Sequence, residues 1–215
     1  MAIPPVLKEI ESFLNGLGRI RLVSGNNPRQ DLAISENGVV QIIQNEGKWV
    51  VKSKNAVEES NTSWFDFTVA TNDATKFYVN VKISELRNSA DNTNCMGGIY
   101  YVLTGSVPPN SMIRIDKKLK RSIRENNNDY YFLVINKKPE ENRLKNAYVC
   151  SLRTLKEIKP AGNNLPFQCV WASNIVGVER SYTEAKDFLL SCYGKSLQRR
   201  AERYETFKEL FPEHV

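Results

Sequence analysis

Two apolar runs separated by a short polar segment constrain the fold more than any other feature of this sequence. The runs are SWFDFTVAT, residues 63–71, and KFYVNVKISEL, residues 76–86, and in both of them apolar and polar residues alternate. Alternation predicts strands, because successive side chains of a strand point to opposite faces. The link between them, TNDATK, is typical of a turn, so the two runs predict a β-hairpin.

The hairpin also predicts which side chains share a face. In the second run the odd-numbered residues 77–83 are apolar and point one way, whereas the even-numbered residues 78–84 point the other way. The even set contains Asn80 and Lys82. In the first run Asp66 shares a face with Trp64 and Thr68. Adjacent strands therefore bring Asp66 beside Asn80 and Lys82 if the register permits.

The rest of the chain predicts a mixture of helices and strands. Apolar residues at helical spacing predict a helix over 4–17, ended by Gly16 and Gly18. Short strands are expected at 38–44 and 48–54, joined by a hairpin turn, and longer ones at 127–137 and from 147. Residues 18–32 fit a strand or a loop, 98–105 a buried strand or a helix, and 159–175 a loop.

The C-terminal part predicts two helices, the first capped by Thr183 and stopped by Gly194, and the second over 195–211. The order of elements indicates an α/β or α+β fold, with a mixed central sheet flanked by helices. We expect one domain over 1–215. Its parts are an N-terminal helix at 1–18, a core at 60–180 that carries the chemistry, and C-terminal helices at 181–215.

Composition excludes several kinds of active site. The chain has 215 residues and four cysteines without a CxxC pair, and its one histidine is His214. A Cys/His zinc site, a Cys–His pair and a Ser–His–Asp triad are therefore not expected. Catalysis has to use carboxylates, lysine and a bound metal ion. There is no apolar run of 18 residues and no signal-like start, so we expect a cytoplasmic protein that does not enter a membrane.

The residues Asp66, Asn80 and Lys82 suit phosphodiester hydrolysis. That reaction needs an activated water and relief of charge at phosphorus, and a divalent ion supplies both. Mg²⁺ prefers oxygen ligands and keeps several waters, so few protein ligands suffice. We expect Asp66 and Asn80 to bind the metal and Lys82 to hold the nucleophile. Because Asn80 brings no charge, a second carboxylate is needed, and Glu9 or Glu11 on the first helix is the natural candidate.

The arrangement Asp66…Asn80-Val81-Lys82 resembles the signature of the PD-(D/E)xK nuclease superfamily, with an amide in place of its second acid. The phrases ADNTNCMGGIYYVLTG and NNLPFQCVWASN look like those of bacterial restriction enzymes. Two departures are Phe65, where the family often has proline, and Asn80. The resemblance implies a type II restriction endonuclease that cuts double-stranded DNA with Mg²⁺. It also implies a cognate DNA methyltransferase as a genetic neighbour.

A net charge of +6 fits a polyanionic partner, and the surplus is concentrated at 114–128, with six Lys/Arg against two acids. These cations suit either phosphate contacts or a solvated helix face, and several amides suit base edges. Palindromic targets favour a two-fold homodimer, although a monomer that nicks each strand in turn is also compatible. The candidate DNA-binding residues are Asp91, Asn92, Asn94, Lys117, Lys118, Lys120, Arg121, Arg124, Gln168 and Asn174.

Two alternatives stay open at this point. A non-catalytic DNA-binding module on a decayed nuclease fold is compatible with Asn80, since the amide removes one metal-binding charge. A repair or junction nuclease of the same superfamily would share the same residues. Incubating DNA with Mg²⁺ and with EDTA separates the first alternative from an enzyme, and the choice of substrate separates the second.

Overall fold

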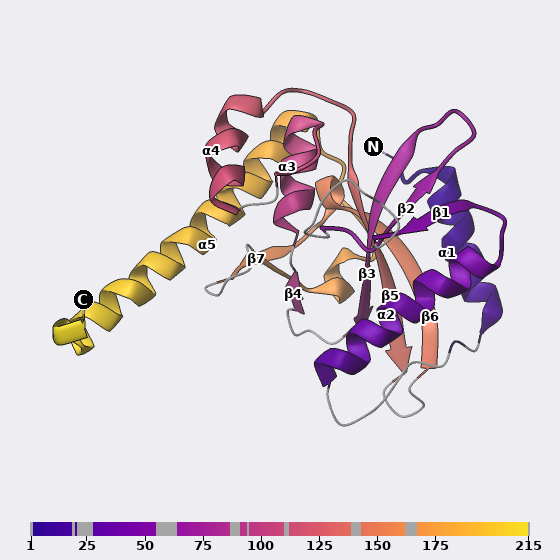
Figure 1. Cartoon of the computed structure of the whole chain (residues 1–215), viewed down its shortest axis with the longest axis horizontal. Helices are drawn as coiled ribbons and strands as arrows, with labels where there is room; N and C mark the ends of the chain where they lie inside the picture. The colour runs from indigo at the N-terminus through magenta and orange to yellow at the C-terminus, as the bar shows by residue number, and fades with distance from the viewer. Residues whose placement is uncertain are drawn as a thin grey trace.

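A five-stranded sheet forms the centre of the protein in the computed structural model (Figure 1), with strand order β1-β2-β3-β5-β6. The structure describes residues 2–18, 20, 28–54, 64–86, 91–93, 95–109, 112–138, 143–161 and 167–214. Strand β3 pairs parallel with β5, and the other pairs are antiparallel. The strands are β1 (Val50–Ser53), β2 (Phe67–Ala70), β3 (Lys76–Ser84), β5 (Tyr130–Lys138) and β6 (Arg143–Ser151).

Helices and a second, smaller sheet cover the central sheet, which gives the predicted α+β architecture. The smaller sheet has the order β4-β8-β7. Within the described residues, no helix is long and apolar enough to cross a lipid bilayer. The helices are α1 (Pro5–Leu17), α2 (Pro28–Asn45), α3 (Met96–Thr104), α4 (Met112–Ser122) and α5 (Tyr182–Leu210), and the small strands are β4 (Asp91–Thr93), β7 (Ile158–Pro160) and β8 (Phe167–Cys169). Short 3-10 turns span Leu152–Thr154, Trp171–Asn174 and Pro212–His214.

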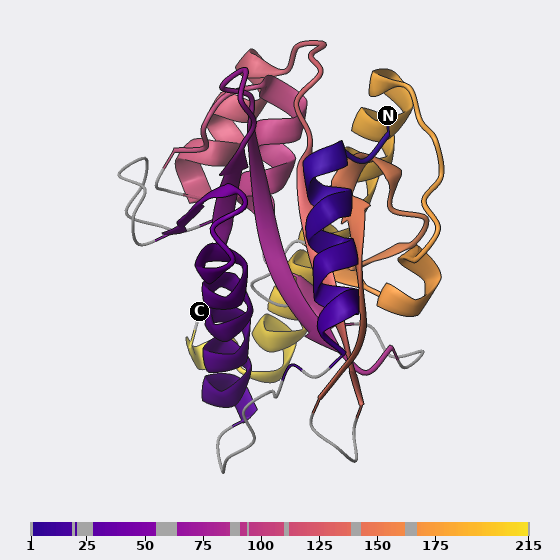
Figure 2. The same cartoon turned by 90° about the vertical axis from the view of Figure 1, so that its right-hand side faces the viewer.

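The two faces of the central sheet bury different helices. Helices α1 and α2 pack their apolar sides on one face, where Val79 and Val81 of β3 lie, and both helices stand in front of the sheet in Figure 2. Helices α3, α4 and α5 pack on the other face, with Tyr78 of β3 and Phe132 of β5. The predicted division of β3 into odd and even faces is confirmed, and both faces are largely buried.

Helix α1 also covers the outer edge of β6 with side-chain hydrogen bonds. The Asn15 amide donates to the Ala147 carbonyl at 2.9 Å and accepts from the Ala147 N–H at 2.6 Å. The Glu11 carboxylate accepts from the Val149 N–H at 2.7 Å. These bonds satisfy backbone groups of β6 that no other strand of the described residues pairs with.

Several predicted elements are confirmed. Helix α1 ends where Gly18 adopts a left-handed conformation (φ 60°), which glycine takes without a steric penalty. The predicted hairpin is the β2–β3 pair, in which Phe67 lies opposite Val79. The strands predicted at 48–54, 127–137 and from 147 correspond to β1, β5 and β6.

Other predictions are wrong. Residues 38–44 belong to α2 and not to a strand, whereas residues 98–105 lie mainly in helix α3, which is one of the two alternatives predicted for them. Helix α5 begins with a capping box between Ser181 and Glu184, so Thr183 is not the cap. It continues through Gly194, because buried Tyr193 and Ser196 hold both sides of that position against the core. Its last turns project from the body of the protein (Figure 1).

Candidate active site

Strand β2 is short, and its early end creates the candidate site. It pairs only with Lys76–Val79, so the longer β3 continues without it on that side. Asp66, the residue before β2, fills the first vacant position. Its N–H donates to the Val79 carbonyl at 2.9 Å, and its Oδ2 accepts from the Val81 N–H at 2.8 Å. The Asp66 carboxylate is thereby fixed on the backbone of β3.

The strand register places Asp66 between a lysine and an asparagine. Ser53 lies opposite Phe67, and Phe67 opposite Val79, so the next row across the three strands is Lys54, Asp66 and Asn80. The Lys54 N–H donates to the Asp66 carbonyl at 2.9 Å, which continues the ladder by one residue. Side chains in such a row are close neighbours, and Lys82 lies two residues further along the same face.

Glycines in α3 hold this row in place from one side of the sheet. A Cβ atom on Gly97 would lie 2.4 Å from the Cβ of Trp64, and one on Gly98 would lie 2.7 Å from the Tyr130 ring. The helix can therefore lie directly on these two aromatic side chains. The buried Tyr130 hydroxyl donates to the Trp64 carbonyl, which fixes the chain two residues before Asp66.

Helix α2 contributes a second carboxylate, Glu36, which the sequence analysis missed. Its Oε1 lies 3.6 Å from the Lys82 Nζ, and the exposed fractions of the two side chains are 16% and 20%. Burial raises the pKa of Glu36, the Lys82 charge lowers it, and the charge of nearby Asp66 raises it. Glu36 and Asp66 are therefore close enough to repel each other, and a cation between them would relieve that repulsion.

The two glutamates predicted for this role lie elsewhere. Glu9 accepts from the Trp49 indole at 3.3 Å and pairs with Lys48, five and six residues before Lys54, which is about 17 to 20 Å along an extended chain. Glu11 binds the backbone of β6, which is three strand spacings, about 14 Å, from β2. Neither helix position reaches Asp66, so the prediction that Glu9 or Glu11 completes the site is wrong, and Glu36 is the carboxylate on which the Asp66 charge acts.

Asn80 supplies an oxygen that the described part of the protein leaves unused. Its Oδ1 atom is buried, and no hydrogen-bond partner for it occurs among the described residues. A buried polar atom without a partner is costly, so a ligand there would stabilise the protein. The oxygens of Asp66, Glu36 and Asn80 have the chemistry that Mg²⁺ prefers. Among the described residues, however, no group of three or more His, Cys, Asp or Glu side chains lies together in a way that could hold a metal ion.

The predicted DNA-binding residues are divided between surface and interior. Helix α4 exposes Lys117, Lys118, Lys120 and Arg121. Exposure is compatible with both predicted alternatives, contact with phosphates and a solvated helix face. The Arg124 guanidinium donates to the Thr104 carbonyl at 3.0 Å, so it also helps to end α3.

Asn174 is the clear correction in this set. It is fully buried, and its amide donates to the Val170 and Glu157 carbonyls and accepts from the Glu157 N–H. All of these bonds lie within the protein, so its role is to hold the loop before α5 and not to contact DNA.

The small sheet holds the other amides predicted to read bases. Asn92 of β4 lies opposite Gln168 of β8, and Asn94 lies outside the described residues. Asp91 accepts from the Ser84 hydroxyl at 2.9 Å, at the end of β3. Burial raises the pKa of Asp91, the bond from Ser84 lowers it, and the Lys82 charge lowers it further. The small sheet therefore begins beside the candidate site.

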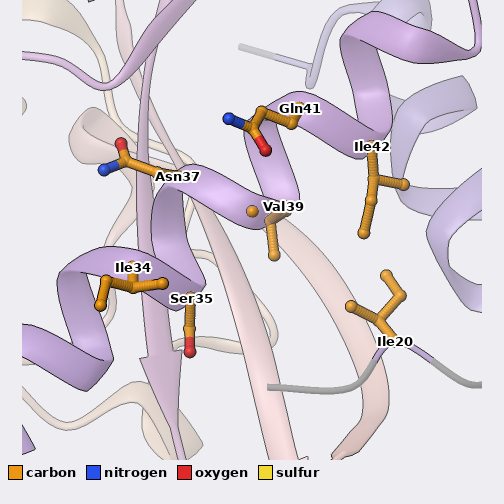
Figure 3. A pocket seen from close by; sticks show the side chains of 8 residues that line it. Ile20, Ile34, Ser35, Asn37, Val39, Gln41 and Ile42 are labelled. Carbon is orange, nitrogen blue, oxygen red and sulfur yellow. The ribbon is translucent and has the colours of Figure 1, made fainter. Parts of the chain in front are cut away.

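A hollow of about 260 Å³ on α2 is a separate feature (Figure 3). Ile20 and Ile42 point toward each other across it, and Asn37 and Gln41 point away from Ile20. The described residues that line it carry no charge and include no candidate site residue. It offers no group for acid, base or metal chemistry, so we do not assign it to the active site.

Comparison with known proteins adds no family to this description. Neither the scan against protein-family models nor the search of curated proteins found a match. The chemistry of the chain has to be argued from its own residues.

Proposed function

We propose that this protein is a type II restriction endonuclease that hydrolyses both strands of double-stranded DNA at a defined sequence, with Mg²⁺. One observation carries the proposal: Asp66 and Asn80 share a row at the open edge of β3, with Glu36 and Lys82 paired beside them. Two carboxylates, an amide oxygen and an ammonium group meet the needs of phosphodiester hydrolysis. The same DNA substrate favours a cytoplasmic protein with a methyltransferase encoded nearby.

Each group has a role in this proposal. Asp66, Glu36 and the Asn80 Oδ1 would hold the metal ion. A bound Mg²⁺ polarises a phosphate and lowers the pKa of a water. The Lys82 ammonium orients the attacking water and stabilises the charge that develops on the phosphate oxygens. The exposed cations of α4 would contact the DNA backbone, and the binding affinity should therefore fall steeply with salt.

Plasmid and linear DNA incubated with the protein provide the test. Discrete fragments that appear with Mg²⁺ and not with EDTA support the proposal. Cutting confined to branched DNA would instead indicate a junction nuclease. Binding without cutting would indicate a non-catalytic DNA-binding module. We keep this module as the second candidate, because Asn80 carries no charge and because two lysines balance the two acids of the site.

Three substitutions test the assignment of residues. Lys82→Ala and Asp66→Asn should each lower the cleavage rate by at least about 100-fold and leave DNA binding largely unchanged. Lys52→Ala is a matched control, since Lys52 is exposed on β1 and lies outside the row. Asn80→Asp adds a charge among the metal ligands, and we expect it to change which divalent ion gives the highest rate. Full activity in Lys82→Ala would remove that residue from the mechanism.

A further inference from the structure

Lys54 is a second lysine at the candidate site, and neither the signature residues nor the resemblance gives it a role. Its Nζ lies 3.2 Å from the Asp66 Oδ1, and its side chain is 30% exposed. The register fixes this pairing, because Lys54 and Asp66 are opposite each other at the end of the β1–β2 ladder. The ion pair is therefore built into the sheet and does not depend on a long surface side chain finding a partner.

The Lys54 ammonium competes with a metal ion for one carboxylate. The Asp66 Oδ2 accepts from the Val81 N–H, and Oδ1 accepts from Lys54, so both oxygens have partners in the protein. A divalent cation at Oδ1 would lie within a few ångströms of the ammonium, and like charges at that distance repel strongly in a half-buried site. The ion pair and the bound metal therefore oppose each other.

The balance of charge points to what resolves this conflict. The candidate site holds two acids, Asp66 and Glu36, and each of them pairs with a lysine, Lys54 and Lys82. These four charges sum to zero, and Asp91 near Lys82 adds at most one negative charge, so a divalent ion makes the site positive unless an anion enters with it. A phosphate group supplies that anion and offers oxygens to the displaced ammonium.

We propose that Lys54 is an internal competitor of the metal ion, which keeps Asp66 occupied until a DNA phosphate arrives. This inference rests on the proposed nuclease function. Metal and DNA then strengthen each other's binding, and by linkage the effect is the same in both directions. The protein without DNA binds divalent ions weakly. Lys54 is a positioning residue in this account, since it acts on the metal through Asp66.

Titration of the DNA-free protein with Mn²⁺ tests this account, and the signal of free aqueous Mn²⁺ in electron paramagnetic resonance is the readout. Lys54→Met keeps the aliphatic stem and removes the charge, and it should tighten Mn²⁺ binding roughly tenfold. Lys54→Arg keeps the charge and should bind like the wild type. Lys52→Met, two residues earlier and exposed on β1, is the matched control and should also leave the affinity unchanged. Adding Asp66→Asn to Lys54→Met should abolish the gain, and thermal melts establish that each variant is folded.

Two other results would overturn the inference, and they are distinguishable. In the first, Lys54→Met binds Mn²⁺ no more tightly than the wild type, while the wild type cuts plasmid DNA with Mg²⁺. The competitor role of Lys54 is then wrong, and the nuclease function stands. If Asp66→Asn leaves Mn²⁺ binding unchanged and the wild type cuts no DNA, the metal site and the proposed function fail together with the inference.

Discussion

Helices α1 and α2 pack on the same face of the sheet, and both carry glutamates, but these carboxylates do different things. On α1, Glu9 and Glu11 pair with Lys48 and with the backbone of β6. On α2, Glu36 lies beside Lys82 and within electrostatic reach of Asp66. The difference follows from the strand that each helix covers: α1 lies on β6, and α2 lies on β1 and β3. The position of each helix over the sheet therefore decides what its carboxylates contact.

The largest effect that tests this comparison is expected for Glu36→Gln. The substitution keeps the shape and removes the charge, so the cleavage rate should fall by at least about 100-fold. Because burial raises the pKa of Glu36, the ionised form costs free energy in the folded protein, and the unfolding midpoint should not fall. Glu46→Gln, exposed just after the same helix, is the control in both assays. An unchanged cleavage rate in Glu36→Gln would show that the glutamate of α2 is no more important for cleavage than those of α1.

A smaller effect, on stability alone, is expected at α1. Asn15→Ala removes both hydrogen bonds to Ala147 and leaves that peptide on the sheet edge without a protein partner. The free energy of unfolding in urea should fall by about 1 kcal/mol, the usual contribution of such bonds, while cleavage stays unchanged. Ser12→Ala, exposed on the same helix, should alter neither quantity.

Glu11→Gln should have a still smaller effect. The amide can still accept from the Val149 N–H, and only the charge and the pair with Lys8 are lost. We expect the free energy of unfolding to fall by about 0.5 kcal/mol and the cleavage rate to stay the same. A large loss of cleavage in Glu11→Gln, measured in the same assay as Glu36→Gln, would indicate that the carboxylate that binds the metal lies on α1.

The smallest effect is expected for Glu9→Gln. Its carboxylate is exposed at the surface, beside Lys48 and the edge of the Trp49 ring. Hydrogen bonds from Trp49 and Lys48 lower the pKa of Glu9, but water competes for each contact. Neither the unfolding midpoint nor the cleavage rate should change measurably, and a change in either would show that the ends of α1 and β1 contribute more than their exposure suggests.

The same pair of helices shows how far sequence reasoning reaches. Helix α1 was predictable because its apolar residues recur at helical spacing and Gly18 ends it. Helix α2 was not, because the adjacent pairs Val39–Val40 and Ile42–Ile43 are β-branched and the glycine at 38 is unfavourable in a helix. Tertiary packing of Val39, Val40 and Ile43 overrides these preferences. Pro28 at the start and Asp31 in the first turn were the signals that could have indicated the helix.

The residues of the candidate site also differ in whether the sequence could predict them. The pairing of Asp66 with Asn80 was predictable, since a hairpin is a local structure whose turn and alternation set the register. Glu36 and Lys54 were not, because their approach to Asp66 depends on the early end of β2 and on the path of α2. The strands of the small sheet are three residues long, and β4 pairs with β8 from a distant part of the sequence, so no periodic pattern indicates them.

The side chains of α1 on the outer edge of β6 also limit how this protein can associate with other chains. An added strand would need the same N–H and carbonyl groups that Asn15 and Glu11 already occupy. Two copies therefore cannot join their central sheets into one continuous sheet through this edge. Intermolecular β-pairing, the usual start of fibrous aggregation, is hindered there by the side chains of α1.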